Sequence, residues 1–290
     1  SDVYKQPSIV RQFTAQITEV GTSNTETWTF SVLRAGIDHF SDSAANWLKA
    51  NFLTWQPTVK PVTYYTPEFL TYYAVVDSVV RCRAYVDKNG EYASYDLTLA
   101  NLASGGVWTI PVQYAIISGK LNKLPSYYDV WVETKTGTRL TYLQRYYATD
   151  IRSEQEQWVL FENSLGGIDT FRAYGDSENT AKHTHNIAEI ENEAEEYRVD
   201  TTREYKKNTG FLSEGERRWL LDFFPSLGKY LYIDSYIRRI VVTESDASWQ
   251  TKELPSSYTF TYKYADARPY LNISRTEQPT ETLNIKVPDV

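Results

Sequence analysis

The chain has 290 residues and a formal net charge of −7. An acidic chain lacks the basic surface that holds a phosphate backbone, so a nucleic acid partner is not expected. The single cysteine, Cys82, excludes both an intrachain disulfide and a zinc site built from several thiolates.

Aromatic residues make up 15% of the chain, with 24 Tyr, 8 Trp and 11 Phe. Such residues suit the pleated surface of a sheet, and Tyr and Trp also favour contact surfaces between molecules. No run approaches the roughly 18 apolar residues of a membrane helix, and residues 1–12 lack the apolar core of a signal peptide. The composition therefore predicts a strand-rich chain without a membrane span.

Two segments near the N-terminus alternate strictly between apolar and polar residues. Residues 12–18 and 27–32 each place their apolar side chains on one face, and the polar residues 21–24 separate them. This pattern predicts a hairpin with one buried face. Residues 43–52 change to helical spacing after Ser and Asp residues suited to an N-cap, which predicts a short helix.

The stretch from residue 80 to residue 146 continues the alternation. Its segments are residues 80–86, 95–99, 108–116, 128–132 and 140–146. An Asp-Lys-Asn-Gly turn ending at Gly90 separates the first two segments, and Pro111 indicates an edge position or a bulge in the third. Residues 59–66, with prolines in and around them, are interpreted as a connection. Strands spaced by about 10–15 residues without helices between them favour an antiparallel sandwich over a βαβ fold.

The second half of the chain returns to strand patterns. These segments are residues 157–162, 168–174, 229–236, 238–243 and 258–264. The pair Gly166 and Gly167 supplies the turn between the first two. Residues 187–195 alternate Ala or Ile with Glu, which fits a charged helix but fits an edge strand protected by its charge better. The run from Ser213 to Phe224 predicts a helix, because Ser213 and Glu216 form a capping box and Pro225 ends the pattern.

These patterns predict an all-β chain of two antiparallel β-sandwich domains with one or two short helices. Residues 1–150 are expected to form an N-terminal β-sandwich domain. Residues 151–267 are expected to form a C-terminal β-rich domain, with the capped helix near residues 213–224. Residues 268–290 are polar and contain prolines, which is typical of an extended arm.

The sequence offers few groups for chemistry. His183 and His185 would share one side of a strand near Glu189 and Glu191, which suits a metal; the favoured interpretation is a solvated loop, because residues 175–186 are polar. Cys82 lies in an apolar strand face and is expected to be a buried, inert thiol. No nucleophile–base pattern or phosphate-binding glycine loop is present. We therefore predict no catalytic residue, no cofactor, no metal and no enzymatic activity.

The aromatic residues leave a binding function open. Six of them cluster around the first predicted helix and the segment after it: Trp47, Trp55, Tyr64, Tyr65, Tyr72 and Tyr73. Exposed Trp and Tyr on a β-sandwich can stack on sugar rings, so a carbohydrate- or surface-binding module is an alternative function, with a glycan as its partner. A contact between subunits explains the same cluster equally well.

Six short segments, spread from Phe52 to Leu212, carry a resemblance to known proteins. They are Phe52-Leu53-Thr54-Trp55-Gln56-Pro57 followed by Pro67-Glu68-Phe69-Leu70; Tyr128-Asp129-Val130-Trp131-Val132; Leu143-Gln144-Arg145-Tyr146; Gly166-Gly167-Ile168-Asp169-Thr170-Phe171; and Asn208-Thr209-Gly210-Phe211-Leu212. In this order they resemble an uncharacterised group of strand-rich proteins encoded in prophage-like gene clusters of gut bacteria. The gene neighbourhood of that group looks like tail and baseplate assembly.

The resemblance implies assembly rather than chemistry. It suggests a structural subunit of a phage-tail-like (prophage) particle, joined to copies of itself or to neighbouring tail proteins. The location it implies is a virion or phage-like particle assembled in the cytoplasm. The arm ends in a short alternating run, residues 283–287, which is able to add as a strand to the sheet edge of another subunit. An arm that folds back on its own domain or frays at its end is an equal alternative.

Overall fold

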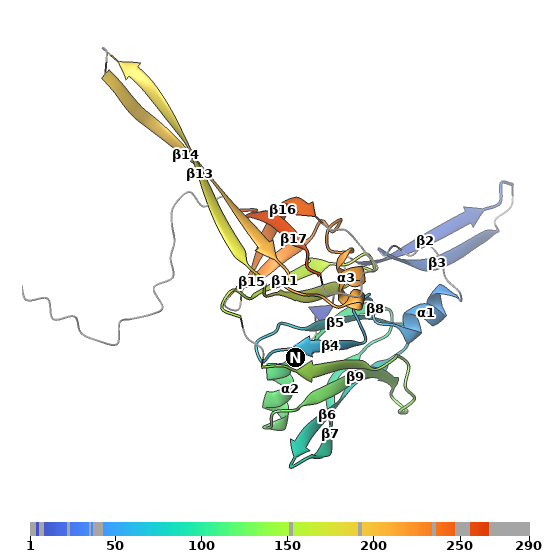
Figure 1. The fold of residues 1–290 in the computed structure, drawn as a ribbon. Helices are drawn as coiled ribbons and strands as arrows, with labels where there is room; N and C mark the ends of the chain where they lie inside the picture. Colours follow the sequence, from blue (N-terminus) through green and yellow to red (C-terminus); the bar gives the residue numbers. More distant parts are fainter. Residues whose placement is uncertain are drawn as a thin grey trace, which may run out of the picture. The chain divides into compact units, whose positions relative to one another are not determined.

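Strands dominate the computed structural model of the chain (Figure 1). The residues that it describes are 4–5, 9–21, 24–34, 36, 43–150, 153–190, 193–233, 236–246 and 256–266. Across these ranges three short helices accompany several antiparallel sheets, so the predicted all-β class is confirmed. None of the helices in the described ranges is long and apolar enough to cross a membrane.

A first core lies between a three-stranded and a five-stranded sheet. The three-stranded sheet has the order β1-β8-β5, with bounds Tyr4–Lys5, Gly106–Pro111 and Phe69–Ala74. The five-stranded sheet has the order β4-β10-β9-β6-β7, with bounds Val59–Val62, Gln144–Ala148, Tyr127–Thr134, Ser78–Lys88 and Glu91–Leu102. Apolar side chains of both sheets, such as Leu70, Ile110, Cys82 and Val130, form one buried cluster. This is the packing of a β-sandwich.

The turn between β6 and β7 has the form that the sequence predicts. Asn89 and Gly90 occupy it with φ values of 57° and 93°. The amide of Gly90 donates to Asp87 Oδ1 at 2.8 Å. Positive φ at both central residues is the requirement of the tight hairpin turns that Asn-Gly favours.

Two expectations for this half are wrong. The expected strand over residues 108–116 ends at Pro111, and helix α2, Tyr114–Leu121, follows. Proline has no N–H to continue a ladder, and Tyr114 and Ile117, three residues apart, both turn into the core. The expected connection over residues 59–66 contains β4, which pairs with β10 in parallel. Because β4 is an edge strand, Pro61 is tolerated in it.

A second core lies against a seven-stranded sheet with the order β12-β11-β15-β16-β17-β14-β13. The bounds, in that order, are Ile168–Ala173, Gln157–Glu162, Lys229–Ile233, Tyr236–Asp246, Thr259–Tyr264, Glu193–Asn208 and Ser177–Ile190. Helix α3, Glu214–Leu220, places Trp219 and Leu220 in this core. The capping box of Ser213 and Glu216 is confirmed, and so is the predicted helix.

Residues 183–201, the parts of β13 and β14 next to their connection, belong to a separate unit and are described by themselves. Their side chains are mostly exposed. The expectation of one edge strand through residues 187–195 is wrong, because β13 ends at Ile190 and β14 begins at Glu193. The alternation of Glu with apolar residues continues on both strands, so the period alone does not reveal where the chain reverses.

Residues on either side of position 150 bond directly to each other. Asn163 Nδ2 donates to the carbonyl oxygen of Leu53 at 2.8 Å, and Lys60 Nζ donates to the carbonyl oxygen of Thr170. The division into domains at residue 150 stays a prediction. The predicted arm, residues 268–290, lies outside the described residues.

Candidate interaction surface

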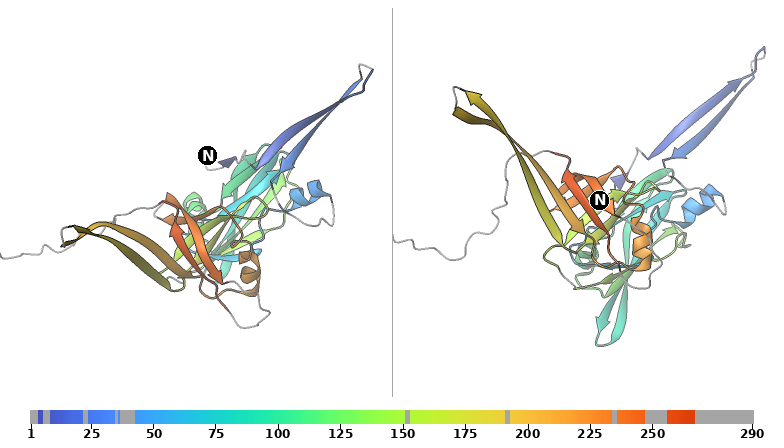
Figure 2. Two further views of the ribbon diagram at one scale, coloured as in Figure 1. Left: turned by 90° about the horizontal axis from the view of Figure 1, so that it is seen from above. Right: turned by 45° about the horizontal axis from the view of Figure 1, so that its top comes forward.

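Strands β2 (Val10–Thr18) and β3 (Thr25–Leu33) form a two-stranded sheet (Figures 1 and 2). One face of this sheet is apolar and open to solvent. Phe13 pairs with Phe30 and Ala15 pairs with Trp28. The Phe13 and Phe30 rings stack with their centroids 5.9 Å apart. The exposed fractions of the large apolar residues on this face are 46% for Phe13, 59% for Ile17, 48% for Trp28, 50% for Phe30 and 46% for Val32.

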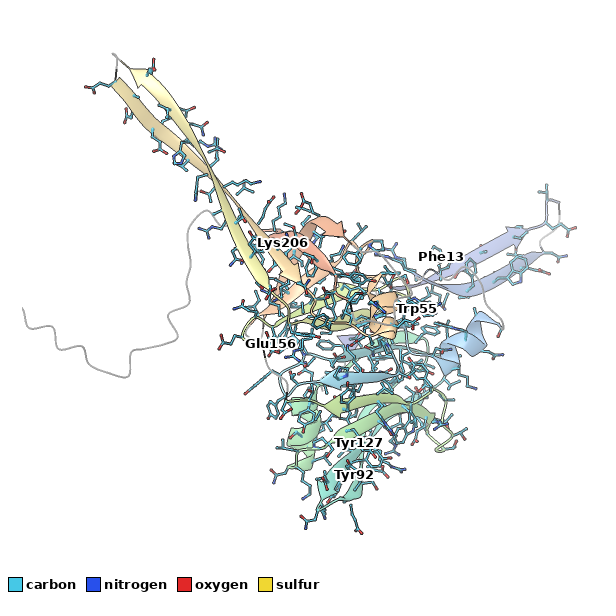
Figure 3. All side chains as sticks on the ribbon, viewed as in Figure 1. Phe13, Trp55, Tyr92, Tyr127, Glu156 and Lys206 are labelled. Carbon is cyan, nitrogen blue, oxygen red and sulfur yellow. The ribbon has the colours of Figure 1, made fainter. Side chains whose placement is uncertain are left out.

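We call this surface the hairpin face. From the strand register it consists of Arg11, Phe13, Ala15 and Ile17 on β2 and Glu26, Trp28, Phe30 and Val32 on β3. The opposite face of the same ribbon carries Val10 and Leu33 at the root, which pack against a buried cluster, and Gln, Thr and Ser beyond them. Figure 3 shows Phe13 on this ribbon.

The predicted hairpin is confirmed, but its predicted buried face is wrong. Alternation fixes which side chains share a face of a strand, whereas covering that face requires another element. Within the described residues neither β2 nor β3 pairs with a further strand, and none of the three buried clusters contains a hairpin-face residue. A two-stranded sheet is marginal alone, and a contiguous apolar surface marks an interaction site.

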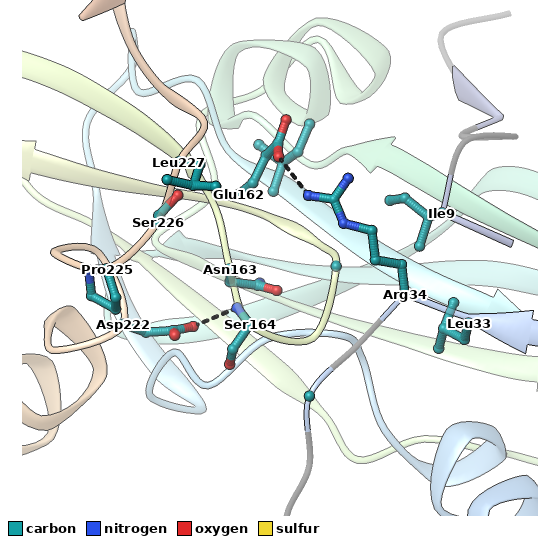
Figure 4. A pocket seen from close by; sticks show the side chains of 13 residues that line it. Ile9, Leu33, Arg34, Glu162, Asn163, Ser164, Asp222, Pro225, Ser226 and Leu227 are labelled. Carbon is teal, nitrogen blue, oxygen red and sulfur yellow. Dashed lines mark hydrogen bonds and ion pairs between the residues drawn. The ribbon is translucent and has the colours of Figure 1, made fainter. Parts of the chain in front are cut away.

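A groove of about 550 Å³ lies at the root of the hairpin (Figure 4). Arg34, directly after β3, forms one wall, and its Nη2 lies 3.9 Å from Glu162 Oε2. Asp222 forms the opposite side and accepts from the amide of Ser164 at 2.8 Å. Charges of both signs therefore line this groove.

The six clustered aromatic residues divide between core and surface. Tyr72 is fully buried, whereas Trp55 and Tyr65 are 45% and 63% exposed. Trp55 Nε1 donates to Ser164 Oγ at 3.0 Å, and its ring lies 6.1 Å from that of Trp47. The complete set has Tyr72 buried, Trp47 and Tyr73 half-buried, and Trp55, Tyr64 and Tyr65 exposed.

The outer face of the five-stranded sheet carries a second group of aromatic side chains (Figure 3). The Tyr127 ring stacks on Tyr85 at 4.4 Å, and the Arg145 guanidinium lies 4.7 Å from the centre of the same ring. Tyr85 and Arg145 stand on the two strands that flank β9, so they cover opposite faces of Tyr127. Stacking on a sugar needs an open ring face. Tyr127 is therefore not a stacking platform for a sugar.

A cluster of buried charges joins the two cores. Lys60 Nζ lies 2.7 Å from Glu68 Oε1, and both side chains are almost fully buried. Burial raises the pKa of Glu68 to about 7 and that of Asp169 to about 6. Asp169 also accepts from Trp219 Nε1 at 2.8 Å. Such pKa values occur in acid–base catalysis, but neither carboxyl lines the groove at the root of the hairpin.

Sequence reasoning missed this cluster. Lys60 lies in the segment interpreted as a connection, Glu68 lies just after that segment, and Asp169 follows a glycine turn. Charged residues at such positions are ordinarily exposed. No pattern in the sequence marks them as buried partners.

His183 and His185 lie on β13, so the favoured interpretation of a solvated loop is wrong. Their rings are 6.4 Å apart. His183 Nδ1 lies 3.0 Å from Thr201 Oγ1, and His185 Nδ1 lies 2.5 Å from Glu196 Oε1. No group of three or more His, Cys, Asp or Glu side chains in the described ranges could hold a metal ion. Glu191, weighed as a ligand, is outside those ranges.

Cys82 is enclosed in the first core, which confirms the predicted burial. Burial raises the pKa of its thiol far above the usual range. The thiolate is the reactive form of cysteine, so this thiol is inert toward nucleophilic chemistry.

Comparison with known proteins adds no relative to this description. No protein-family model matches the chain, and no curated protein matches it. The fold and the surfaces described above are therefore what supports a functional proposal.

Proposed function

We propose that this protein is a structural subunit that works through protein–protein assembly. The hairpin face is the single observation that carries the proposal. Large apolar side chains stand open there on a ribbon that nothing in the described part of the chain covers. Burying apolar surface is favourable by about 25 cal/mol per Å², so contact with another protein stabilises this ribbon.

The backbone of the ribbon supports the same proposal. β2 and β3 pair only with each other among the described strands, so each presents one edge with free N–H and C=O groups. A strand of another chain can pair with such an edge and place alternate side chains on the apolar face.

The sequence resemblance gives the proposal its setting. We place the subunit in a phage-tail-like particle encoded by a prophage, joined to copies of itself or to neighbouring tail proteins. The chain then reaches the virion or phage-like particle after assembly in the cytoplasm. The proposal assigns it no catalytic step, cofactor or metal, and it keeps the arm of residues 268–290 as a second assembly element.

A carbohydrate-binding module remains the alternative function, and the described aromatic residues do not favour it. Both faces of the Tyr127 ring are covered. Trp55 lies against Trp47 and bonds to Ser164 through its indole N–H. The exposed Phe13 and Phe30 rings stack on each other, so each covers one face of the other.

Sedimentation velocity of the full chain, alone and co-expressed with the products of its adjoining genes, tests the proposal. The variant Phe13→Ser/Phe30→Ser removes both rings of one pair from the hairpin face. The matched control, Thr14→Ala/Thr29→Ala, changes a pair on the opposite face of the same strands. We expect the first variant to lose assembly and the control to keep it. Equal assembly of both variants contradicts the proposal.

A further inference from the structure

We infer that the occupant of the hairpin face is the hairpin face of a second copy of this chain, packed antiparallel about a two-fold axis. Arg11 of each copy then meets Glu26 of the other. The inference rests on the proposed assembly function and names the partner of the same surface.

The order of side chains along the face is the observation behind it. The face has four rows from the root of the hairpin to its tip: Arg11 with Val32, Phe13 with Phe30, Ala15 with Trp28, and Ile17 with Glu26. A cation therefore stands at one end, an anion at the other, and apolar rows lie between them. Neither Arg11 nor Glu26 belongs to an ion pair among the described residues.

A two-fold axis across the strands places the root of one ribbon over the tip of the other. β2 then lies over β2 of the second copy in the opposite direction. Phe13 faces the small Ala15 of the second copy, and Phe30 faces Trp28 of the second copy. On β2 a large side chain thus packs against a small one, and on β3 two aromatic rings pack against each other.

The positions of Arg11 and Glu26 favour this antiparallel orientation. Arg11 lies over the row of the second copy that holds Ile17 and Glu26. In that row Glu26 stands on the neighbouring strand, about 5 Å to the side of Ile17, within reach of a long side chain. An axis along the strands would instead place the two Arg11 side chains in one row and the two Glu26 side chains in another. Like charges brought together in this way are unfavourable, whereas the antiparallel arrangement forms two opposite-charge contacts by symmetry.

The hairpin face is small, so its self-association must be measured at high chain concentration. Four rows on two strands present less than the roughly 800 Å² per partner of a standard interface. Association through this surface alone is therefore weak, and sedimentation must extend to about 500 µM chain to detect it.

Charge exchange within the face tests the inference. Arg11→Glu and Glu26→Arg, made singly, each place like charges at both ends of the contact, so each should weaken self-association at least about tenfold. The double variant restores opposite charges and should recover self-association. The control Gln12→Glu adds a negative charge to the opposite face of β2 and should leave association unchanged. Circular dichroism and a thermal melt establish that each variant remains folded.

The outcomes separate this inference from the proposed function. A wild-type chain that stays monomeric at about 500 µM overturns the inference, and so do single variants without effect or a double variant that does not recover. If the charge variants behave like the wild type while Phe13→Ser/Phe30→Ser loses co-assembly, the face binds a different protein and the proposed function stands. If that apolar variant also assembles normally, both fail.

Discussion

Gly167 lies directly against the backbone of Leu53. A Cβ added to Gly167 would stand 2.2 Å from the carbonyl oxygen of Leu53 and 3.0 Å from Asn163 Nδ2. Asn163 Nδ2 donates to that same carbonyl at 2.8 Å, so neither neighbour can retreat without breaking the bond. The glycine turn thus holds the β11–β12 connection against the segment after α1, Ala44–Ala50.

Gly167→Ala should therefore destabilise the protein by about 2 kcal/mol or more, because the backbone must shift to admit the methyl group. Gly119→Ala is the matched control, since Gly119 lies in α2 with nothing within 4 Å of the position that an added Cβ would occupy. Alanine is favoured over glycine in a helix by about 0.5–1 kcal/mol, so this control should be stabilised. Urea denaturation measures both changes, and equal effects would contradict the packing described.

Lys207 is buried beside an exposed neighbour of the same type, Lys206. Its Nζ donates to the carbonyl oxygen of Gly175 at 2.7 Å, to Ser177 Oγ at 2.8 Å, and to the carbonyl oxygen of Gln155. Lys207→Ala leaves buried acceptors without a donor, so we expect a loss of about 2–4 kcal/mol in the free energy of unfolding. Lys206→Ala, at the position labelled in Figure 3, should change it by less than about 0.5 kcal/mol. Urea denaturation of the two variants measures the difference, and equal losses would contradict the buried role of Lys207.

Glu68 should make stability fall as pH rises. Burial raises its pKa from 4.5 to about 7, so the folded chain holds this proton at pH values where the unfolded chain has lost it. Its contribution to stability is therefore complete below about pH 4.5 and is lost as pH rises to about 7, by up to about 3 kcal/mol.

Glu68→Gln removes this titration while leaving the other groups in place. The difference in unfolding free energy, wild type minus variant, should decrease from pH 5 to about pH 7 and then level off. Urea denaturation at a series of pH values measures that difference. A difference that does not change with pH would show that Glu68 ionises as an exposed carboxylate does.

His183 and His185 are predicted not to form a metal site. Isothermal titration with zinc or nickel should give no saturable heat, and chelator should leave the thermal melt unchanged. A native-state ligand at about 100 times its dissociation constant adds about 2.7 kcal/mol, so a real site would be visible. Saturable binding that His183→Ala abolishes would refute this prediction.

The sequence predictions that are confirmed rest on residues that lie close together along the chain. The Asn89-Gly90 turn and the capping box of Ser213 and Glu216 each depend on residues close in sequence, and both form as expected. The burial of Cys82 follows from its place in a strong alternation. Such features are fixed by neighbours along the chain, so one sequence reveals them.

The features that were missed depend on distant partners. The alternation around Phe13 predicts a face but not its exposure, because only tertiary structure decides what covers a strand. The parallel pairing of β4 with β10 joins segments that lie far apart along the chain. Lys60 and Glu68 have the sequence context of surface charges, and only the fold brings them together in a buried pair.

The central claim is that the hairpin face becomes buried when the protein assembles. Hydroxyl-radical footprinting with mass spectrometry compares side-chain oxidation in assembled and monomeric fractions of the wild-type chain. Oxidation of Phe13, Trp28 and Phe30 should fall several-fold on assembly, while oxidation of Tyr92, which is 57% exposed on β7, should stay the same. Assembly with unchanged oxidation at those three aromatic residues would contradict the claim.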